Sequence, residues 1–299
     1  MLQTAARPHC WICGDQALVR VKPSGLGQHR LSSSDFAITD RRYGLTAAID
    51  RCSACGFLQC SDIADELKFY SDLDDTEYDA GRAQRALQAR ALLRKLDNPG
   101  ARSLLDVGAG SGILVEEALR LGYRAEGVEP SAHLAAEATA HGVAVHRGAL
   151  PHPALEGRAF DIVTLVDVIE HVSDPITLLR HMRAALAPDG IGIVVTPDVE
   201  SVAARLLGWR WWHYRIAHIG YFNRSTLELA LRKAGLRAIM FGRPRWYFSG
   251  DYLGERLVSY LPGPLSRVTF KWARRITVPL DLRDSMFVLF QPAENCPEM

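Results

Sequence analysis

From residue 101 onward, short apolar runs alternate with amphipathic segments. Runs of four to seven mostly apolar residues predict strands, whereas apolar positions that recur every three or four residues predict helices. The predicted strands are residues 103–107, 123–128, 143–145, 160–165, 191–195, 236–241 and 286–290. The predicted helices are residues 113–121, 131–140, 176–186 and 227–234. Because strands separated by helices pair in parallel through right-handed crossovers, the pattern predicts an α/β fold with a doubly wound, seven-stranded sheet.

The first hundred residues follow a different pattern. Residues 8–61 carry few helix signals and hold five of the six cysteines, in two Cys-x-x-Cys-Gly turns and one further position. Two helical stretches, 62–70 and 77–96, then lead to an Asn-Pro-Gly break. We therefore expect three regions. They are a module over 1–61, a helical bridge over 62–100, and a main domain over 101–299 that contains an insert at 243–283.

Composition narrows the class of protein. The chain has 299 residues, 48% of them hydrophobic and 23% charged, with a net charge of +1. Proteins that bind the phosphate backbone of nucleic acids are typically basic, so the near-neutral charge of this chain disfavours nucleic acid as a partner. The polar N-terminus is not typical of a signal peptide. Because no apolar run reaches about 18 residues, we expect no membrane span. We expect a cytoplasmic protein with reduced cysteines, whose paired spacing then indicates metal or redox chemistry.

A glycine-rich loop follows the first strand of the main domain. It reads Asp106-Val-Gly-Ala-Gly-Ser-Gly112, which gives the spacing G-x-G-x-G. A dinucleotide site has G-x-G-x-x-G, and here Ile113 takes the place of its third glycine. Glu129 ends the second strand, where a carboxylate can accept hydrogen bonds from both hydroxyls of a ribose. The alternative is a glycine turn in another α/β fold.

These residues resemble the class I S-adenosylmethionine (SAM)-dependent methyltransferases over residues 101–200. The resemblance implies a Rossmann-like fold with the glycines beside the methionine part of SAM and Glu129 at the ribose. The residues that it assigns to the SAM site are Asp106, Gly108, Ala109, Gly110, Gly112, Glu129, Pro130, Ala149, Leu150, Asp167 and Val168. Many relatives carry an acidic residue near the adenine amine. Residues 146–150 hold none, which favours adenine contact through backbone groups and apolar stacking.

The segment after the fourth strand bears on the methyl acceptor. It reads Asp167-Val-Ile-Glu-His171, where amine-directed nucleic-acid methyltransferases carry an Asn/Asp-Pro-Pro-Tyr type of motif. This resembles the small-molecule branch, which methylates hydroxyls or carbons. His171 is a candidate general base because an imidazole pKa of about 6.5 suits proton transfer. Alternatively, His171 caps the next segment or orients the Glu170 loop.

An aromatic and histidine cluster occupies residues 209–222. Its pattern, Gly-x-Arg-Trp followed by His-x-x-Tyr-Phe, is similar to bacterial methyltransferases that often act on sugars or secondary metabolites. By that resemblance Tyr214 and His218 are candidates for acceptor contact. The alternative is an amphipathic helix whose aromatic side chains pack on the core.

The two Cys-x-x-Cys-Gly turns predict a metal site. Cys10, Cys13, Cys52 and Cys55 supply four thiolates, which suits a closed, tetrahedral, structural zinc. The alternatives are reduced structural cysteines or a redox pair, and Cys60 and Cys296 are expected to be plain thiols. The module resembles the zinc-binding region of sugar C-methyltransferases, which are generally longer, so a sugar-nucleotide substrate stays open. Zinc modules also precede some ribosomal-RNA guanine methyltransferases.

The insert at 243–283 combines aromatic residues with a basic stretch that contains Arg274 and Arg275. It is a candidate lid over the acceptor, or a peripheral membrane contact for a lipid-linked acceptor. A solvated helix packed on the sheet is the plainer alternative.

The sequence thus predicts a SAM-dependent methyltransferase with a structural zinc ion. Its acceptor would be a hydroxyl or carbon of a sugar, a secondary metabolite or a lipid-linked intermediate. An RNA methyltransferase and a non-catalytic scaffold with a SAM-binding fold are the competing hypotheses. Nothing in the pattern indicates an oligomeric state.

Overall fold

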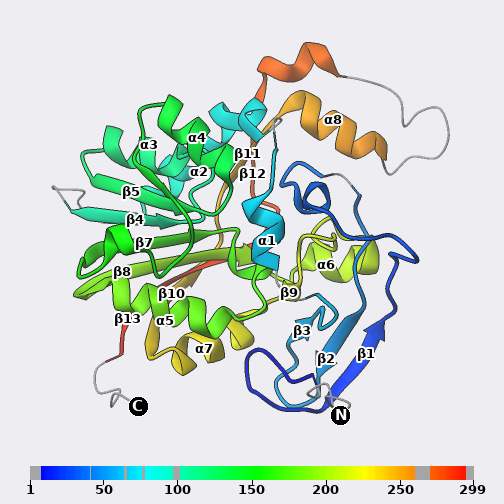
Figure 1. The fold of residues 1–299 in the computed structure, drawn as a ribbon. Helices are drawn as coiled ribbons and strands as arrows, with labels where there is room; N and C mark the ends of the chain where they lie inside the picture. Colours follow the sequence, from blue (N-terminus) through cyan, green and yellow to red (C-terminus); the bar gives the residue numbers. More distant parts are fainter. Residues whose placement is uncertain are drawn as a thin grey trace.

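The computed structural model describes residues 8–40, 42–63, 66–75, 78–96, 102–259 and 270–293 (Figure 1). A large sheet flanked by helices and a smaller N-terminal sheet lie side by side in this view.

Seven strands form the larger sheet of the described chain, in the order β10-β13-β8-β7-β4-β5-β6. Their bounds are β4 Ser103–Val107, β5 Arg124–Glu129, β6 Val145–Arg147, β7 Phe160–Val166, β8 Leu186–Pro197, β10 Leu236–Gly242 and β13 Ser285–Pro292. All neighbours are parallel except β13, which runs antiparallel to β8 and β10. The predicted doubly wound, seven-stranded α/β sheet is therefore confirmed. The strand order reverses between β4 and β7, and ligands bind such sheets at the carboxyl ends of the strands near this point.

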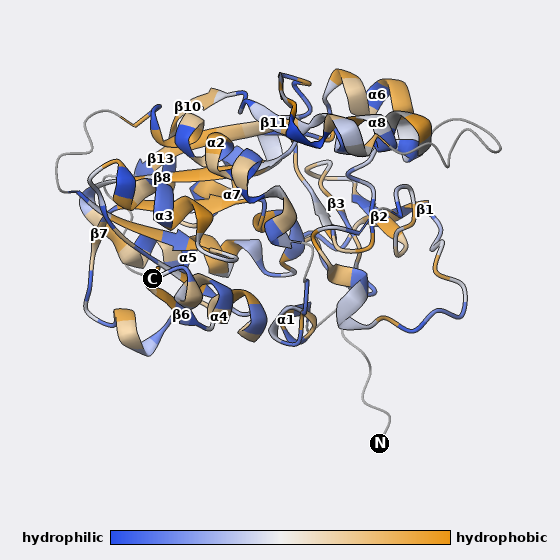
Figure 2. Cartoon of the chain, turned by 90° about the horizontal axis from the view of Figure 1, so that it is seen from above, coloured by the Kyte–Doolittle hydropathy of each residue, from blue (hydrophilic) through white to orange (hydrophobic). Residues whose placement is uncertain are grey.

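Helices cover both faces of this sheet because successive strand residues point to opposite sides. Ile162 packs with α2 (Arg82–Leu93) and α3 (Ile113–Arg120), whereas its neighbour Val163 packs with α5 (Pro175–Ala185) and α7 (Arg224–Lys233). Helix α4 (Ala132–Ala140) lies against β5 and β6. Figure 2 shows β8 and β13 as hydrophobic strands between helices of mixed character.

Some predicted element bounds are wrong, for local reasons. The expected helix over 77–96 is the short η2 (Tyr78–Gly81) followed by α2, since Gly81 separates the two. The third strand begins two residues late. Gly142 is left-handed and the N–H of Val143 bonds to Ala138 O, so Val143 closes the preceding helix.

The N-terminal sheet contains strands from two of the predicted regions, the N-terminal module and the main domain. It is ordered β1 (Leu18–Lys22), β2 (Ile49–Cys52), β3 (Leu58–Gln59) and β9 (Gly220–Tyr221). Strand β9 comes from the main domain and pairs with β3, with Leu58 opposite Tyr221. The N-terminal module is thereby joined to the larger domain by backbone hydrogen bonds as well as by side-chain packing.

Three further segments complete the fold. Helix α1 (Glu66–Ser71) belongs to the bridge, and α6 (Val202–Leu207) follows β8. The insert forms a hairpin of β11 (Trp246–Ser249) and β12 (Thr277–Leu280), with α8 (Gly250–Ser259) and η7 (Lys271–Arg275) between its strands. Within these described ranges, no helix is long and apolar enough to cross a membrane.

Candidate functional site

The glycine loop adopts backbone angles that favour glycine at three positions. Gly108, Gly110 and Gly112 have φ of +74°, +54° and +76°. A Cβ on Gly108 would lie 2.5 Å from Val168 Cγ2, and one on Gly110 would lie 2.6 Å from Tyr78 Oη. The glycines therefore permit both the turn and the close approach of neighbouring side chains.

Glu129 holds this loop from the end of β5. Its carboxylate accepts hydrogen bonds from Gly110 N and Ser131 N, both at 2.8 Å, and the residue is buried. Burial raises the pKa of Glu129, because desolvation penalises the charged form. The carboxylate thus lies at the end of β5, beside the glycine loop, and its contact with a ribose stays a prediction.

Two aspartates lie at the ends of neighbouring strands. Asp106 accepts a hydrogen bond from Thr164 Oγ1 at 2.6 Å, and burial raises its pKa to about 7. Asp167 follows β7 with φ of +53°, and burial raises its pKa to about 7 as well. The nearby guanidinium of Arg85 lowers the pKa of Asp167, whereas Asp284 raises it.

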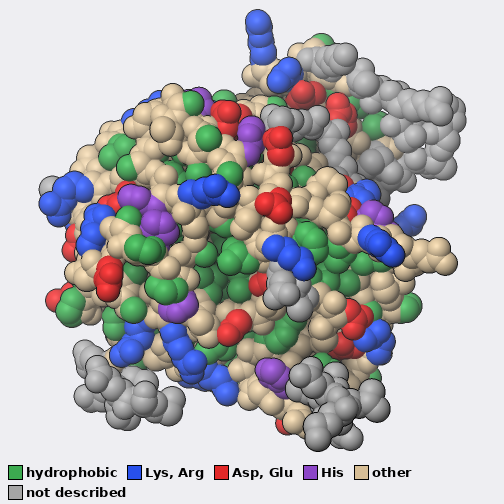
Figure 3. Space-filling view, in the orientation of Figure 1, with side chains coloured by type: hydrophobic (Ala, Val, Ile, Leu, Met, Phe, Trp, Pro, Cys, Tyr) green, Lys and Arg blue, Asp and Glu red, His purple; other side chains and the backbone are tan. Residues whose placement is uncertain are grey.

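A cavity of about 1340 Å³ opens at this edge of the sheet. Figure 3 shows hydrophobic side chains gathered in a hollow at the centre of this face. All but one of the predicted SAM-site residues line it, namely Asp106, Gly108, Ala109, Gly110, Glu129, Pro130, Ala149, Leu150, Asp167 and Val168. Gly112 is the exception. It begins α3 and packs against Val143 and Ala138.

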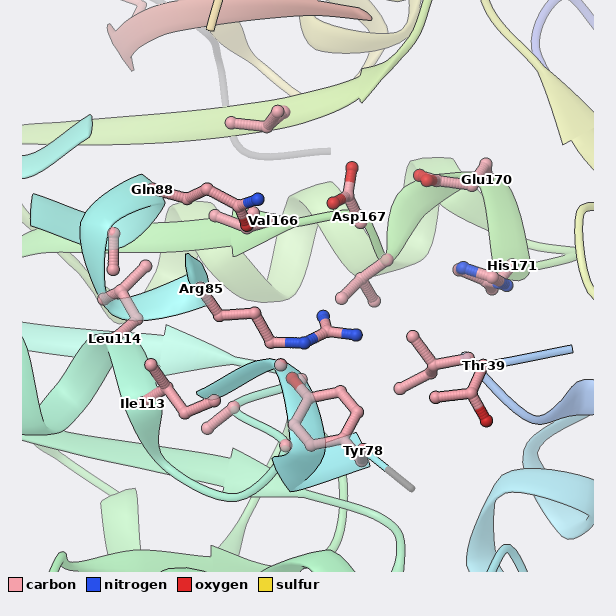
Figure 4. Close-up of a pocket in the computed structure, with 18 of the residues that line it drawn as sticks. Thr39, Tyr78, Arg85, Gln88, Ile113, Leu114, Val166, Asp167, Glu170 and His171 are labelled. Carbon is pink, nitrogen blue, oxygen red and sulfur yellow. The ribbon is translucent and has the colours of Figure 1, made fainter. Parts of the chain in front are cut away.

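The helical bridge supplies cavity residues that the sequence analysis missed. Arg85 and Gln88 project from α2, and Tyr78 comes from η2 (Figure 4). Arg85 extends into the cavity between Asp167 and Tyr78, with its guanidinium carbon 4.2 Å from the centroid of the Tyr78 ring. The amphipathic pattern of the bridge indicated a helix, but no motif pointed to its position against the glycine loop.

Glu170, His171 and His218 meet in the cavity wall, with potential ligand atoms all within 4.8 Å of one another. Thr196 Oγ1 donates to Glu170 Oε2 at 2.9 Å, and Glu170 Oε1 is buried with no hydrogen-bond partner among the residues that the structure describes. His171 Nδ1 lies 2.8 Å from Ala217 O and 2.6 Å from Tyr70 Oη. A carboxylate with two imidazoles is a donor set that could hold a divalent cation.

Burial shifts the pKa values of this group in opposite directions. The pKa of Glu170 rises well above its ordinary value, and that of His171 falls to about 3. The pKa of His218 also falls well below its ordinary value. Both imidazoles are therefore neutral at physiological pH and can accept a hydrogen bond.

The aromatic cluster divides between core and cavity. Trp211, Tyr214 and Tyr221 are buried and pack with one another in a core that they share with the N-terminal module. Tyr214 does not line the cavity, so the structure does not bring this predicted residue to the site. Trp212, His213 and His218 do line it.

Asp284 is a second cavity residue that the sequence analysis missed. It immediately precedes β13, whose antiparallel direction carries its first residue, Ser285, to a position opposite Pro197 at the carboxyl end of β8. Trp212 Nε1 donates to Asp284 Oδ2 at 2.8 Å, and His213 Nε2 lies 3.3 Å from the same oxygen. No local motif marks this aspartate, because only the pairing of β13 places it.

The four paired cysteines converge. Cys10 Sγ lies 3.5 Å from Cys55 Sγ, Cys13 Sγ lies 3.5 Å from Cys52 Sγ, and all four sulfurs are within 4.8 Å of one another. A tetrahedral zinc with Zn–S bonds of about 2.3 Å would hold its sulfurs about 3.8 Å apart, so the cluster fits the ion. Cys60 lies outside this group, and burial raises the pKa of its thiol to about 12. Cys296 lies outside the described residues.

The insert closes another side of the cavity. Trp246, Phe248 and Tyr252 line it, as does Arg256 of α8. The Arg256 guanidinium carbon lies 4.6 Å from the ring centroid of Tyr43 and 5.0 Å from that of Trp212. This side chain therefore joins the insert to the N-terminal module and to the segment before β9.

Comparison with known proteins is consistent with this geometry. A family model described as a methyltransferase domain matches residues 78–240. A ubiquinone biosynthesis O-methyltransferase from Cereibacter sphaeroides is 31% identical over 164 residues, which cover 49% of this chain and 66% of the relative. One from Methylobacterium nodulans is 34% identical over 152 residues, which cover 46% and 61%. The chain thus spans just under two thirds of the length of these curated relatives.

Solved structures share the fold. A chain from the complex between the Haloferax volcanii Trm112 methyltransferase activator and a methyltransferase aligns with a TM-score of 0.55 and 16% identity, covering 78% of this chain and 100% of that one. The structure of TnmH aligns with a TM-score of 0.50 and 19% identity, covering 72% and 57%.

The raised pKa of Asp106 predicts a pH-dependent stability. An aspartate in the unfolded chain titrates near pH 3.9, so between about pH 4 and pH 7 the folded state holds the extra proton. The stability that this group contributes is therefore present at low pH and lost as pH rises through that window. Relative to Asp106→Asn, the wild-type free energy of unfolding should fall from pH 5 to pH 7 by at most about 1.4 kcal/mol per pH unit.

Urea unfolding of both proteins at several pH values measures this difference, in which the histidine contributions cancel. The matched control is Asp189→Asn, which removes an exposed aspartate instead of a buried one. A wild-type minus Asp106→Asn difference that is constant over pH 5–7 would contradict the assignment.

Proposed function

This chain belongs to the methyltransferase-domain family, and we propose that it transfers the methyl group of SAM to a hydroxyl or carbon of a small molecule. The observation that carries the proposal is a single cavity that joins the glycine loop and Glu129 to a histidine-rich wall. The first part has the shape and donor set for SAM, and the second has room for an acceptor.

The residues present fit SAM. Gly108 and Gly110 leave space that a Cβ would fill, and Glu129 offers a buried carboxylate to the ribose hydroxyls. Ala149 and Leu150 line the cavity and would give adenine apolar contact, and Arg85, which extends into the cavity, would pair with the methionine carboxylate. When bound, SAM supplies an electrophilic methyl carbon on a sulfonium.

The opposite part of the cavity fits a neutral or weakly polar acceptor with an apolar body. Trp246, Phe248 and Tyr252 form apolar walls, and the neutral rings of His171 and His218 can each accept a hydrogen bond. These contacts would hold an acceptor atom in line with the methyl carbon, which is the main task of such an enzyme. The net charge of +1 and the Asp167-to-His171 segment support a small molecule over RNA.

We also propose that Cys10, Cys13, Cys52 and Cys55 bind a structural zinc ion. Four thiolates leave no open position for catalysis. The ion would fix the β2–β3 hairpin, whose strand β3 pairs with β9. Its contribution to the site would therefore be the position of the segment that carries His218.

The insert is proposed as a lid, because its side chains line the cavity. Peripheral membrane contact through 243–283 stays a prediction. On this segment Trp272 is 76% exposed and Ile276 48%, beside the exposed Arg274 and Arg275.

The function is tested with isotope-labelled SAM and a panel of phenols, sugars, lipid-linked intermediates and RNA, with products identified by mass spectrometry. We expect SAM binding in calorimetry and a labelled small-molecule product. Glu129→Gln should weaken SAM binding about 10- to 100-fold, because it removes the negative charge that would accept the two hydrogen bonds from the ribose hydroxyls. The matched control is Glu126→Gln on the same strand, whose partners His146 and Arg158 lie outside the cavity. Product from RNA alone would contradict the proposal, and SAM binding without any product would favour a scaffold.

The histidine wall gives a second prediction. His171→Ala and His218→Ala should bind SAM as the wild type does but turn over at least tenfold more slowly, because both act on the acceptor. His146→Ala, outside the cavity, is the control. If both cavity variants retain full turnover with the identified acceptor, the assignment of His171 and His218 is wrong.

The cysteine cluster gives a third prediction. The purified protein should contain about one zinc ion per chain by plasma mass spectrometry, and Cys13→Ser combined with Cys55→Ser should remove it and lower the melting temperature. Cys60→Ala should retain the zinc. Wild-type protein without zinc, or a double variant that keeps it, would refute the site.

A further inference from the structure

Two residues from distant parts of the chain meet in the cavity wall. His213 lies between α6 and β9, and Asp284 immediately precedes β13. His213 Nε2 is 3.3 Å from Asp284 Oδ2, and Asp284 is 2% exposed. A histidine paired with a buried carboxylate at a cavity surface is a common arrangement for proton transfer.

Several contacts fix the carboxylate of this pair. Trp212 Nε1 donates to Asp284 Oδ2 at 2.8 Å, and the backbone N–H of Asp198 donates to Asp284 O at 2.9 Å. Arg243 pairs with Asp198 at 2.7 Å and donates to Ser285 O at 3.1 Å. Asp284 is therefore held from its side chain, its own carbonyl and the next residue.

The imidazole is held as well. The His213 ring stacks on that of His218 at 5.5 Å with an interplanar angle of 18°, and it meets the Trp211 ring edge-on at 4.8 Å. Because Nε2 faces a carboxylate, it carries the proton and donates to Asp284. Nδ1 is then the basic nitrogen of the neutral ring.

His213 differs from the other histidines of the cavity in having a carboxylate as its partner. Of the described histidines that line it, His213 is the one with an ion-pair distance to a carboxylate. His171 has the backbone carbonyl of Ala217 and the hydroxyl of Tyr70 as its hydrogen-bond partners, and both are uncharged. The neighbouring Glu170 does not supply the charge either, because burial raises the pKa of this carboxyl group well above its ordinary value and keeps it protonated. Asp284 supplies that charge to His213.

We propose that His213 and Asp284 are the proton-accepting pair for a hydroxyl acceptor, a role that rests on the proposed function. As the acceptor oxygen forms its bond to the methyl carbon, the carbon–sulfur bond breaks and its electron pair stays on sulfur, giving a neutral thioether. The hydroxyl proton passes to His213 Nδ1, and the O–H electron pair stays on oxygen. The resulting imidazolium is balanced by Asp284, while His171 and His218 hold the acceptor.

Turnover tests this role. With catechol as the probe and S-adenosylhomocysteine release as the readout, His213→Gln and Asp284→Asn should lower kcat 100-fold or more. KM for catechol and the SAM dissociation constant should change less than threefold. His29→Gln is the matched control, since His29 also pairs with a buried carboxylate, that of Asp35, but away from the cavity. Added imidazole should restore part of the turnover of His213→Gly.

Two results would overturn the proposal. One is wild-type kcat in His213→Gln. The other is a long-range ¹H–¹⁵N spectrum in which the neutral His213 ring carries its proton on Nδ1, since the pair requires it on Nε2. The spectrum needs no acceptor. A wild-type protein that methylates no hydroxyl probe at all would instead refute the proposed hydroxyl chemistry, and the spectrum would still decide whether the pair exists.

Discussion

The hydrogen bonds that Glu129 accepts are the constraint on which the rest of the site depends. Through Gly110 N and Ser131 N, one carboxylate fixes both the glycine loop after β4 and the start of α4 after β5. The N–H groups of Gly108 and Ala109 both bond to Val128 O, so the loop folds back on the strand that ends at Glu129. The left-handed glycines make this fold possible, and it leaves the cavity open at the carboxyl edge of the sheet. Binding of a ribose would place two hydroxyls on a carboxylate that is already oriented.

A second set of backbone hydrogen bonds connects the cysteine module to the acceptor side. The N–H of Cys60 bonds to Ile219 O, and the N–H of Ile219 bonds to Glu170 O. The residue that follows β3, Cys60, is therefore only two backbone hydrogen bonds from the loop that carries Glu170 and His171. Arg215 reinforces the connection by donating to the carbonyls of Ala37 and Ile38, and Ile38 itself lines the cavity. A structural metal in this module would stabilise one wall of the acceptor site without contacting the acceptor.

The sequence predicted best what depends on local pattern. The seven strands follow from short apolar runs. The motif that joins the glycine loop to Glu129 predicted residues that do line the cavity, since Asp106 to Gly110 are contiguous and Glu129 ends the next strand. The sequence pattern did not predict which residues from distant parts of the chain would reach the cavity. Arg85 reaches the cavity only because α2 packs against α3, and Asp284 reaches it only because β13 is antiparallel. Tyr214, a candidate for acceptor contact by its pattern, packs in the core beside the N-terminal sheet and is not among the residues that line the cavity.

The cavity is lined partly by residues of the matched family region and partly by residues outside it, so family membership alone does not identify the acceptor. The matched family region, residues 78–240, contains the glycine loop, Glu129 and the histidines at 171, 213 and 218. Other wall residues come from outside it, among them Ile38 and Tyr43 of the N-terminal module, Glu66 and Tyr70 of the bridge, Trp246 and Arg256 of the insert, and Asp284. Arg256 joins the insert to the N-terminal module by packing on Tyr43 and Trp212. The part of the cavity that fits SAM is thus built from the family's common fold. By our proposal, the acceptor side combines the three histidines of the matched region with these outer walls. The family match gives no information on the outer walls, so the acceptor has to be sought from their shape and chemistry.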